Sequence, residues 1–249
     1  MIDADLVRQI IVAHDAARPR SQQTAVGPSD LSSPCSRKLV YQLLGVPKVV
    51  DDAVNLMAWV GTGIHAQMEQ ALKDDDDWVT EQRLTIKVAK GISITGSLDA
   101  YHKPSRTIVD WKSVGPSALA KYRRASPEKY LDQVSIYGLM AVLSGRMSVE
   151  NTCIAYLPRN GDLADIHVDL HPWDEDRADR AIRRLEALHA AADAGPTVLP
   201  LVPTGDDCRY CGWWMPGSDT PEVACTGHPT TDVHGIPPWQ PHTQEAASA

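Results

Sequence analysis

Phenylalanine is absent from this 249-residue chain, and no apolar run reaches the roughly 18 residues that a membrane-spanning helix requires. Residues 1–5 also lack the basic and apolar regions of a secretory signal peptide. Net positive charge is lacking as well: the formal net charge is −8 at pH 7, whereas non-specific binding of nucleic acid depends largely on Lys and Arg. These absences argue against a membrane protein and predict a cytoplasmic one, in which any phosphate-binding surface is local.

The periodicity of the apolar residues changes along the chain. Helical spacing predicts helices over residues 3–17, 36–44, 54–73, 127–144 and 173–192. Alternation predicts three strands in series near 84–88, 92–98 and 107–112, and two more near 153–157 and 164–170 joined by an Asn160-Gly161 turn. Residues 19–34 are expected to form a polar loop. The helix over 54–73 is expected to bury one stripe of side chains: Val54, Met57, Ala58, Ile64, Met68 and Leu72.

Asp99, Asp110 and Lys112 form the candidate catalytic cluster. In an extended strand Asp110 and Lys112 point the same way, roughly 6 to 7 Å apart along the backbone. A turn over residues 103–106 would bring the strand end at Asp99 back beside Asp110. Two carboxylates can hold Mg²⁺ against a phosphate, and a lysine can stabilise the charge that develops there. The cluster therefore suits phosphodiester hydrolysis, and an acidic hairpin with a surface lysine is the alternative on these residues alone.

The order of the elements and two further motifs resemble a known superfamily. A helix precedes three strands, with Asp99 on the second strand and Asp110-Trp111-Lys112 on the third, and this order resembles the PD-(D/E)XK nucleases. Gly61-Thr62-Gly63-Ile64-His65 and Gln133-x-x-x-Tyr137 resemble the motifs of its RecB-like branch. The resemblance implies an α/β (α+β) fold, a restriction-endonuclease-like core with a mixed central sheet flanked by helices, and a metal-stapled cysteine-rich C-terminal segment.

The resemblance also implies a domain plan. The N-terminal helical segment occupies residues 1–50, and the nuclease core occupies residues 51–195. A cysteine-rich segment follows at 196–228, and residues 229–249 have the composition of a disordered tail.

The same resemblance assigns roles to the cluster. His65, Asp99, Asp110 and the backbone carbonyl of Trp111 would ligate the metal, and Lys112 would be the catalytic cation. An imidazole ligand fits an enzyme that works with Mn²⁺ as well as Mg²⁺.

Four more residues lie in or near these motifs. Glu69 is one helical turn after His65 and is either a neighbour of the site or an exposed acid. Glu81 matches an acidic position of these enzymes. Gln133 and Tyr137 share one helix face and would hold the substrate strand, because an amide and a phenol can bind phosphate or stack on a base.

Four of the five cysteines are candidate metal ligands. Without a secretory signal, metal binding fits better than a disulfide framework, and Cys153 lies in an apolar strand as a core residue. One N-terminal and three C-terminal cysteines resemble the iron-sulfur members of the RecB-like group, which implies a structural 4Fe-4S cluster on Cys35, Cys208, Cys211 and Cys225. The gap from Cys211 to Cys225 is longer than in that pattern, so Zn²⁺ held by Cys208, Cys211, Cys225 and His228 is the alternative.

These expectations converge on a metal-dependent DNA exonuclease that acts on single-stranded ends. The resemblance implies a role in recombination, repair or CRISPR adaptation, with proteins of those pathways as partners. A phage-encoded member of the family and a homo-oligomer are both compatible with it. The rivals are a non-catalytic DNA-end-binding or adaptor protein and an iron-sulfur redox sensor. Basic residues at 121–124 and 37–38 each fit a solvated helix face.

Overall fold

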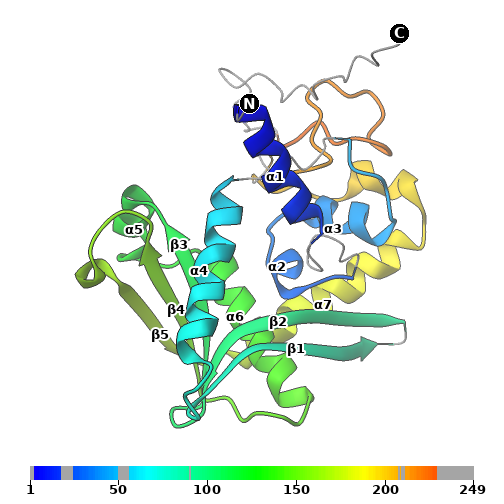
Figure 1. The fold of residues 1–249 in the computed structure, drawn as a ribbon. Coiled ribbons are helices and arrows are strands. Elements are labelled where there is room, and N and C mark those ends of the chain that lie inside the picture. Colours follow the sequence, from blue (N-terminus) through cyan, green and yellow to red (C-terminus); the bar gives the residue numbers. More distant parts are fainter. Residues whose placement is uncertain are drawn as a thin grey trace. The chain divides into compact units, whose positions relative to one another are not determined.

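The computed structural model describes residues 3–17, 25–49, 56–89, 91–206, 208 and 211–228, so the tail expected at 229–249 lies outside the described residues. The chain divides into two compact units (Figure 1). The first consists of Met1–Ser32 and Val54–Glu186, and the second of Ser33–Ala53 and Ala187–Ala249.

A single mixed sheet organises the first unit. Among the described residues its strands follow the order β1-β2-β3-β4-β5, and every neighbouring pair is antiparallel except β3 and β4, which are parallel. The strands are β1 (Trp78–Ala89), β2 (Ile92–His102), β3 (Thr107–Val114), β4 (Asn151–Pro158) and β5 (His167–Pro172). Parallel strands need a long crossover, and α5 (Pro116–Tyr122) and α6 (Glu128–Leu143) provide it between β3 and β4. The expected mixed α/β architecture is confirmed.

Helices cover the two faces of this sheet (Figure 1). On one face Met68 and Leu72 of α4 (Leu56–Leu72) pack against a cluster of strand residues that contains Val109 and Trp111. On the other face the cluster around Ile154 and Tyr156 packs against α5 and α6. Alternate β3 side chains therefore face opposite layers, which places Asp110 and Lys112 on the α6 side.

The first unit also contains helices outside these layers. Asp3 caps α1 (Ala4–Ala16) by accepting a hydrogen bond from the Leu6 backbone N–H at 2.8 Å. The short α2 (Pro28–Leu31) contacts α6 and β2. The described helices include none with the length and apolar character that crossing a bilayer demands.

The second unit has a small core of its own. Helix α3 (Ser36–Leu43) packs against the 3-10 helix η2 (Pro196–Leu201). Tyr41 stacks on Trp213, with ring centres 5.6 Å apart and planes 10° from parallel. Val40, Leu199 and Val202 complete the buried cluster together with Cys225.

Three expectations about individual elements are wrong. The expected polar loop at 19–34 contains α2, whose Leu31 is buried, because Pro at the first helical position starts the turn. The expected strand at 164–170 begins only at His167, after the 3-10 helix η1 (Leu163–Asp165). In α4, Met57 and Ala58 are exposed, because the helix packs through its later turns. Val54 lies outside the described residues.

Candidate active site and cysteine cavity

A fork between β2 and β3 creates the first half of the site. The two strands pair only from Ala100↔Val109 to the turn, so the β3 backbone beyond Val109 has no β2 partner in this register. The Asp99 carboxylate fills the gap by accepting a hydrogen bond from the Trp111 backbone N–H, at 2.9 Å from Oδ2. This bond satisfies a donor that would otherwise be unpaired and places Asp99 beside Asp110.

His65 and Glu81 approach Asp99 from α4 and β1. His65 Nδ1 lies 3.3 Å from Asp99 Oδ1. Glu81 has a φ of +46°, in the left-handed region, and neither Glu81 nor Asp99 takes part in the β1–β2 register. Among the described residues, these three are the group that places three potential ligand atoms within 4.8 Å of one another. Carboxylate oxygens and one imidazole form a donor set that suits Mn²⁺ or Mg²⁺.

Asp110 and Lys112 form the second half of the site. Lys112 Nζ lies 2.7 Å from Asp110 Oδ2, donates a hydrogen bond to Gln133 Oε1 at 3.2 Å, and sits 4.8 Å from the centre of the Tyr130 ring. The Asp110 contact is a buried ion pair at hydrogen-bond distance. The ammonium is thus held from three directions, and the ionised Asp110 carboxylate has further lone pairs beyond the one that faces Lys112.

The site shifts the pKa values of its members in opposite directions. Burial raises the pKa of Asp110, and the nearby Lys112 ammonium offsets only part of this. Burial also disfavours ionised Asp99, but the hydrogen bond and charge of His65, the Lys112 ammonium and the Trp111 N–H together outweigh this and lower the pKa of Asp99. Burial lowers the pKa of His65, but the Asp99 carboxylate more than compensates, so the pKa of His65 is raised. Without metal, His65 and Asp99 therefore favour the ionised pair.

The remaining motif residues lie at different depths. Gln133 is buried on α6 and contacts the site through Lys112. Tyr137 is buried one turn later, where a Cβ atom added to Gly96 would come within 3.2 Å of its ring. Glu69 is exposed on α4 and does not belong to the donor group of His65. The sequence did not predict that Tyr130 contacts Lys112. The only signal for it was the position of Tyr130 on the same helix, three residues before Gln133.

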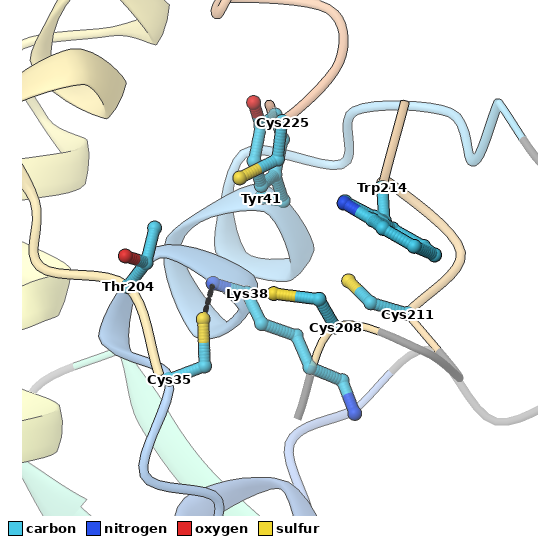
Figure 2. A pocket seen from close by; sticks show the side chains of 8 residues that line it. All are labelled: Cys35, Lys38, Tyr41, Thr204, Cys208, Cys211, Trp214 and Cys225. Carbon is cyan, nitrogen blue, oxygen red and sulfur yellow. Dashed lines mark hydrogen bonds between the residues drawn. The ribbon is translucent and has the colours of Figure 1, made fainter. Parts of the chain in front are cut away.

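Four cysteines of the second unit line one cavity (Figure 2). Cys35 lies at the start of α3, and the others come from the C-terminal loops. Backbone N–H groups donate to three of the sulfur atoms: Lys38 N to Cys35 Sγ at 3.4 Å, Gly227 N to Cys225 Sγ at 3.4 Å, and His228 N to Cys208 Sγ at 3.2 Å. Such donors stabilise thiolates, which are the metal-binding form of cysteine.

Other groups complete the cavity wall. The Arg37 guanidinium donates to Cys225 Sγ at 3.8 Å. The indole of Trp214 lines the cavity with its nitrogen turned inward, and this buried N–H has no hydrogen-bond partner among the described residues (Figure 2). Burial raises the pKa of Cys211 to about 11, so a bound cation is needed to favour its thiolate.

Cys153 lies apart from this cavity, as expected. It is buried in β4 within the cluster that faces α4. Burial, reinforced by the carboxylates of Asp169 and Asp110, raises its pKa to about 12. Cys153 is therefore a neutral core thiol, and the prediction for this residue is confirmed.

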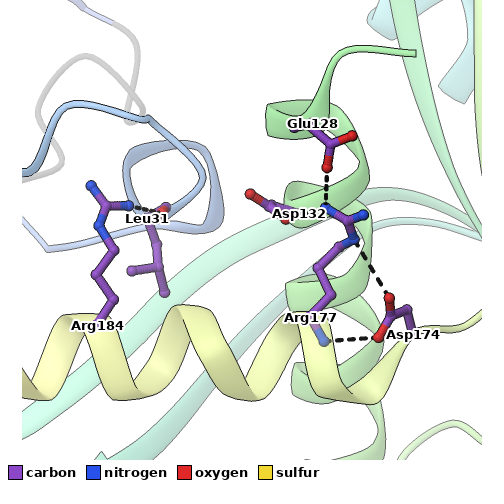
Figure 3. Close-up of polar contacts among 6 residues, drawn as sticks. All are labelled: Leu31, Glu128, Asp132, Asp174, Arg177 and Arg184. Carbon is purple, nitrogen blue, oxygen red and sulfur yellow. Dashed lines mark hydrogen bonds and ion pairs between the residues drawn. The ribbon is translucent and has the colours of Figure 1, made fainter. Parts of the chain in front are cut away.

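An arginine ties α6, which carries Gln133, to α7 (Glu175–Ala192) (Figure 3). Arg177 Nη1 lies 2.7 Å from both Glu128 Oε2 and Asp132 Oδ1, and Arg177 Nε lies 3.6 Å from Asp174 Oδ2. One turn of α6 separates Glu128 from Asp132, so the guanidinium fixes the first turns of that helix. Two turns after Arg177, Arg184 donates to the Leu31 carbonyl at the end of α2, at 3.0 Å.

Comparison with solved structures identifies the fold. The protein SSO0001 aligns with a TM-score of 0.55 at 15% identity, over 85% of this chain and 93% of its own. The alkaline exonuclease LHK-Exo of Laribacter hongkongensis aligns with a TM-score of 0.51 at 12% identity, over 73% and 94%. Its complex with dAMP gives 0.51 at 14% identity, over 70% and 90%. The chain therefore shares its fold with these two proteins.

No family profile and no curated protein matches the chain, so the likeness rests on structure at low sequence identity. Within this fold, the sheet fork brings together His65, Asp99, Asp110, Lys112 and Gln133. It adds Glu81 to the donor group of His65 and Asp99.

Proposed function

We propose that this protein is a metal-dependent DNA exonuclease that hydrolyses phosphodiester bonds at single-stranded ends. One observation carries the proposal: the ligand atoms of His65, Glu81 and Asp99 lie within 4.8 Å of one another, beside the Asp110–Lys112 ion pair. Solved structures of this fold include an alkaline exonuclease and its dAMP complex, which supports a nuclease acting on DNA. A catalytically silent DNA-end binder has no need for this arrangement.

His65, Glu81, Asp99 and Asp110 would hold Mg²⁺ or Mn²⁺. Asp110 fits this role because its carboxylate is buried at the fork, held by Lys112 Nζ at 2.7 Å from Oδ2, and carboxylate oxygens are ligands that these cations prefer. The Trp111 carbonyl would join them, since the N–H and C=O of one strand residue point to the same edge and the Trp111 N–H points into the fork. A metal ion there would neutralise phosphate charge and lower the pKa of a bound water.

Lys112 would stabilise the negative charge that develops on the phosphate. Its ammonium is already oriented by Asp110, Gln133 and the Tyr130 ring, so little reorganisation is needed during the reaction. Gln133 would then act at least partly through Lys112, with its amide N–H₂ left to bind the substrate strand together with Tyr137.

A structural 4Fe-4S cluster on Cys35, Cys208, Cys211 and Cys225 belongs to the same proposal. In the described part of the chain, no three cysteine sulfurs lie within 4.8 Å of one another, although all four line one cavity. A tetrahedral zinc ion with Zn–S bonds of about 2.3 Å would hold sulfurs about 3.8 Å apart, whereas the irons of a cubane cluster hold them farther apart. The four cysteines that line the cavity are the number of ligands that the cluster would need. Zinc on Cys208, Cys211, Cys225 and His228 is the competing assignment, but His228 reaches the cavity through its backbone N–H.

The biological setting extends the proposal. An exonuclease of this kind would act in the cytoplasm, in recombination, repair or CRISPR adaptation, with DNA and the proteins of those pathways as partners. Self-association into a homo-oligomer is compatible with it.

The deciding experiment is a nuclease assay with 5′- and 3′-labelled single strands. Lys112→Ala and Asp110→Ala should each lower the Mn²⁺-dependent rate by on the order of 10³-fold, because each removes charge at the reacting phosphate. Glu69→Gln, an exposed acid on the same helix as His65, is the matched control and should keep full activity. Circular dichroism and the iron or zinc content must match the wild type. Unchanged hydrolysis in either active-site variant would refute the proposed function.

A further inference from the structure

Exposed cations follow the ends of β3 and β4 in the sequence. Lys121 and Arg124 follow β3 on and just after α5, and Arg159 follows β4 directly. All three residues are exposed. Residues 112–127 contain no Asp or Glu, although the whole chain has 32 acidic residues against 24 basic ones. The charge in this region is therefore opposite in sign to that of the chain as a whole.

The hydrogen bonds of β3 and β4 place Arg159 close to the hydrolytic centre. Because the two strands are parallel, their carboxyl ends meet at one edge, and the Arg159 backbone N–H donates to the Val114 carbonyl at 2.9 Å. Val114 follows Lys112 by two residues, which is about 7 Å along a strand. Two nucleotides of a stacked DNA strand span a similar distance, at about 3.4 Å each.

The three exposed cations are not neutralised by the protein. Their neighbour Arg123 contacts Asp165 twice, with Nη2 2.9 Å from the backbone carbonyl and 3.6 Å from Oδ1. Across the described residues, by contrast, Lys121, Arg124 and Arg159 have no ion pair. Unpaired, exposed cations beside a phosphate-cleaving site are suited to bind further phosphates of the same strand.

We propose that Lys121, Arg124 and Arg159 form a phosphate-binding rim that holds the DNA strand next to the scissile bond. This inference rests on the proposed function and specifies where its substrate lies. The contacts are to the backbone and carry no base specificity, so the rim sets affinity and salt dependence. It also gives an acidic protein the local positive surface that binding to DNA requires.

The test measures binding of fluorescein-labelled (dT)20 by anisotropy in EDTA, so that no DNA is cleaved. The triple variant Lys121→Ala/Arg124→Ala/Arg159→Ala should bind at least about tenfold more weakly. The slope of log Kd against log salt should fall by about 2, because three phosphate contacts to a single strand are lost. The matched control is Lys73→Ala/Lys87→Ala/Arg146→Ala, which removes three exposed cations elsewhere in the first unit.

The control should bind within about twofold of the wild type. If both triple variants bind DNA equally weakly, only net charge matters for binding, and the proposed phosphate-binding rim is wrong. In steady-state assays with Mn²⁺, the rim variant should show a raised KM for the oligonucleotide. Its hydrolysis of the p-nitrophenyl ester of thymidine 5′-monophosphate, which is too short to reach the rim, should be unchanged.

The two proposals fail separately. If the wild type cleaves DNA but the rim variant binds like the control, the rim is wrong and the exonuclease stands. If the wild type cleaves nothing in any metal while the rim variant alone loses binding, the rim stands as a DNA-binding surface and the proposed function is wrong.

Discussion

The sheet fork and the cysteine cavity both gather metal-binding groups from distant segments, yet they hold those groups by different means. At the fork the donors satisfy one another, as His65 does Asp99 and Lys112 does Asp110. They also stand on regular strands and on α4. In the cavity the sulfurs lie mainly on loops, and backbone N–H groups and Arg37 are the groups that approach them.

This difference separates two uses of a metal. Groups that pair with one another need no metal to stay in place, so a metal bound at the fork is free to serve chemistry. Thiols that face a shared cavity gain little from one another, so a metal there would contribute directly to folding of its unit. We therefore expect the first unit to keep its fold without metal and the second unit to depend on it.

The largest expected effect is on the second unit. Cys208→Ser should remove the bound iron or zinc and increase amide hydrogen exchange in residues 33–49 and 187–206 by on the order of 100-fold or more, because local unfolding is no longer opposed by metal binding. Exchange in β3 and β4 should stay as in the wild type. Hydrogen exchange with mass spectrometry and metal analysis provide the measurement.

Cys153→Ala is the matched control for that experiment. It removes a buried thiol outside the cavity and should leave metal content and exchange in the second unit unaltered. If Cys208→Ser keeps stoichiometric metal and slow exchange, the cavity is held by packing alone and the contrast between the two regions is lost.

A smaller effect is expected at the fork, where His65→Gln tests whether the donors stabilise one another without metal. The pKa of His65 is raised from its ordinary 6.5, so the charged His65–Asp99 pair contributes fully below about pH 6.5 and is lost as the pH rises through the raised value. In EDTA the variant should melt a few degrees below the wild type at about pH 5.5, and the gap should close by about pH 8.5. A gap that widens with pH would contradict the ion pair.

The smallest expected effect concerns Trp214. In the iron-loaded protein its inward N–H would donate to the cluster and stabilise the reduced, more negative state. Trp214→Phe should therefore lower the reduction potential by about 40 mV, equivalent to about 1 kcal/mol for one electron, with iron content unchanged. Met215→Leu, the neighbouring exposed residue, is the control in the same potentiometric titration. A colourless, redox-inactive protein that contains zinc would refute the cluster.

The sequence predicted what depends on local pattern and order. Alternating apolar residues located the strands, and the turn at residues 103–106 was placed where the structure has it. The turn and the resemblance to RecB-like nucleases together predicted that His65, Asp99 and Asp110 lie near one another, and the structure places His65 Nδ1 3.3 Å from Asp99 Oδ1. The local pattern was not enough to predict α2 or η1, because four- and three-residue helices carry too few residues for a period to emerge.

Other features depend on packing between segments. Tyr130 lies beside Lys112 because α6 crosses the sheet at one particular place, and Trp214 turns inward because its strand-like bridge to Cys225 orients it. Neither contact can be predicted from the spacing of residues in the sequence. The same is true of the missing β2 partner beyond Val109, which gives Asp99 its role at the fork.

The left-handed backbone at Glu81 has a consequence for how this protein can be altered. A side chain in that conformation costs about 1 kcal/mol or more, and glycine would remove the cost. A library screened for heat resistance should therefore enrich Gly at position 81, while one screened for DNA cleavage should retain Glu. Opposite outcomes of the two selections at this position would show that Glu81 lowers the stability of the fold and is retained for activity.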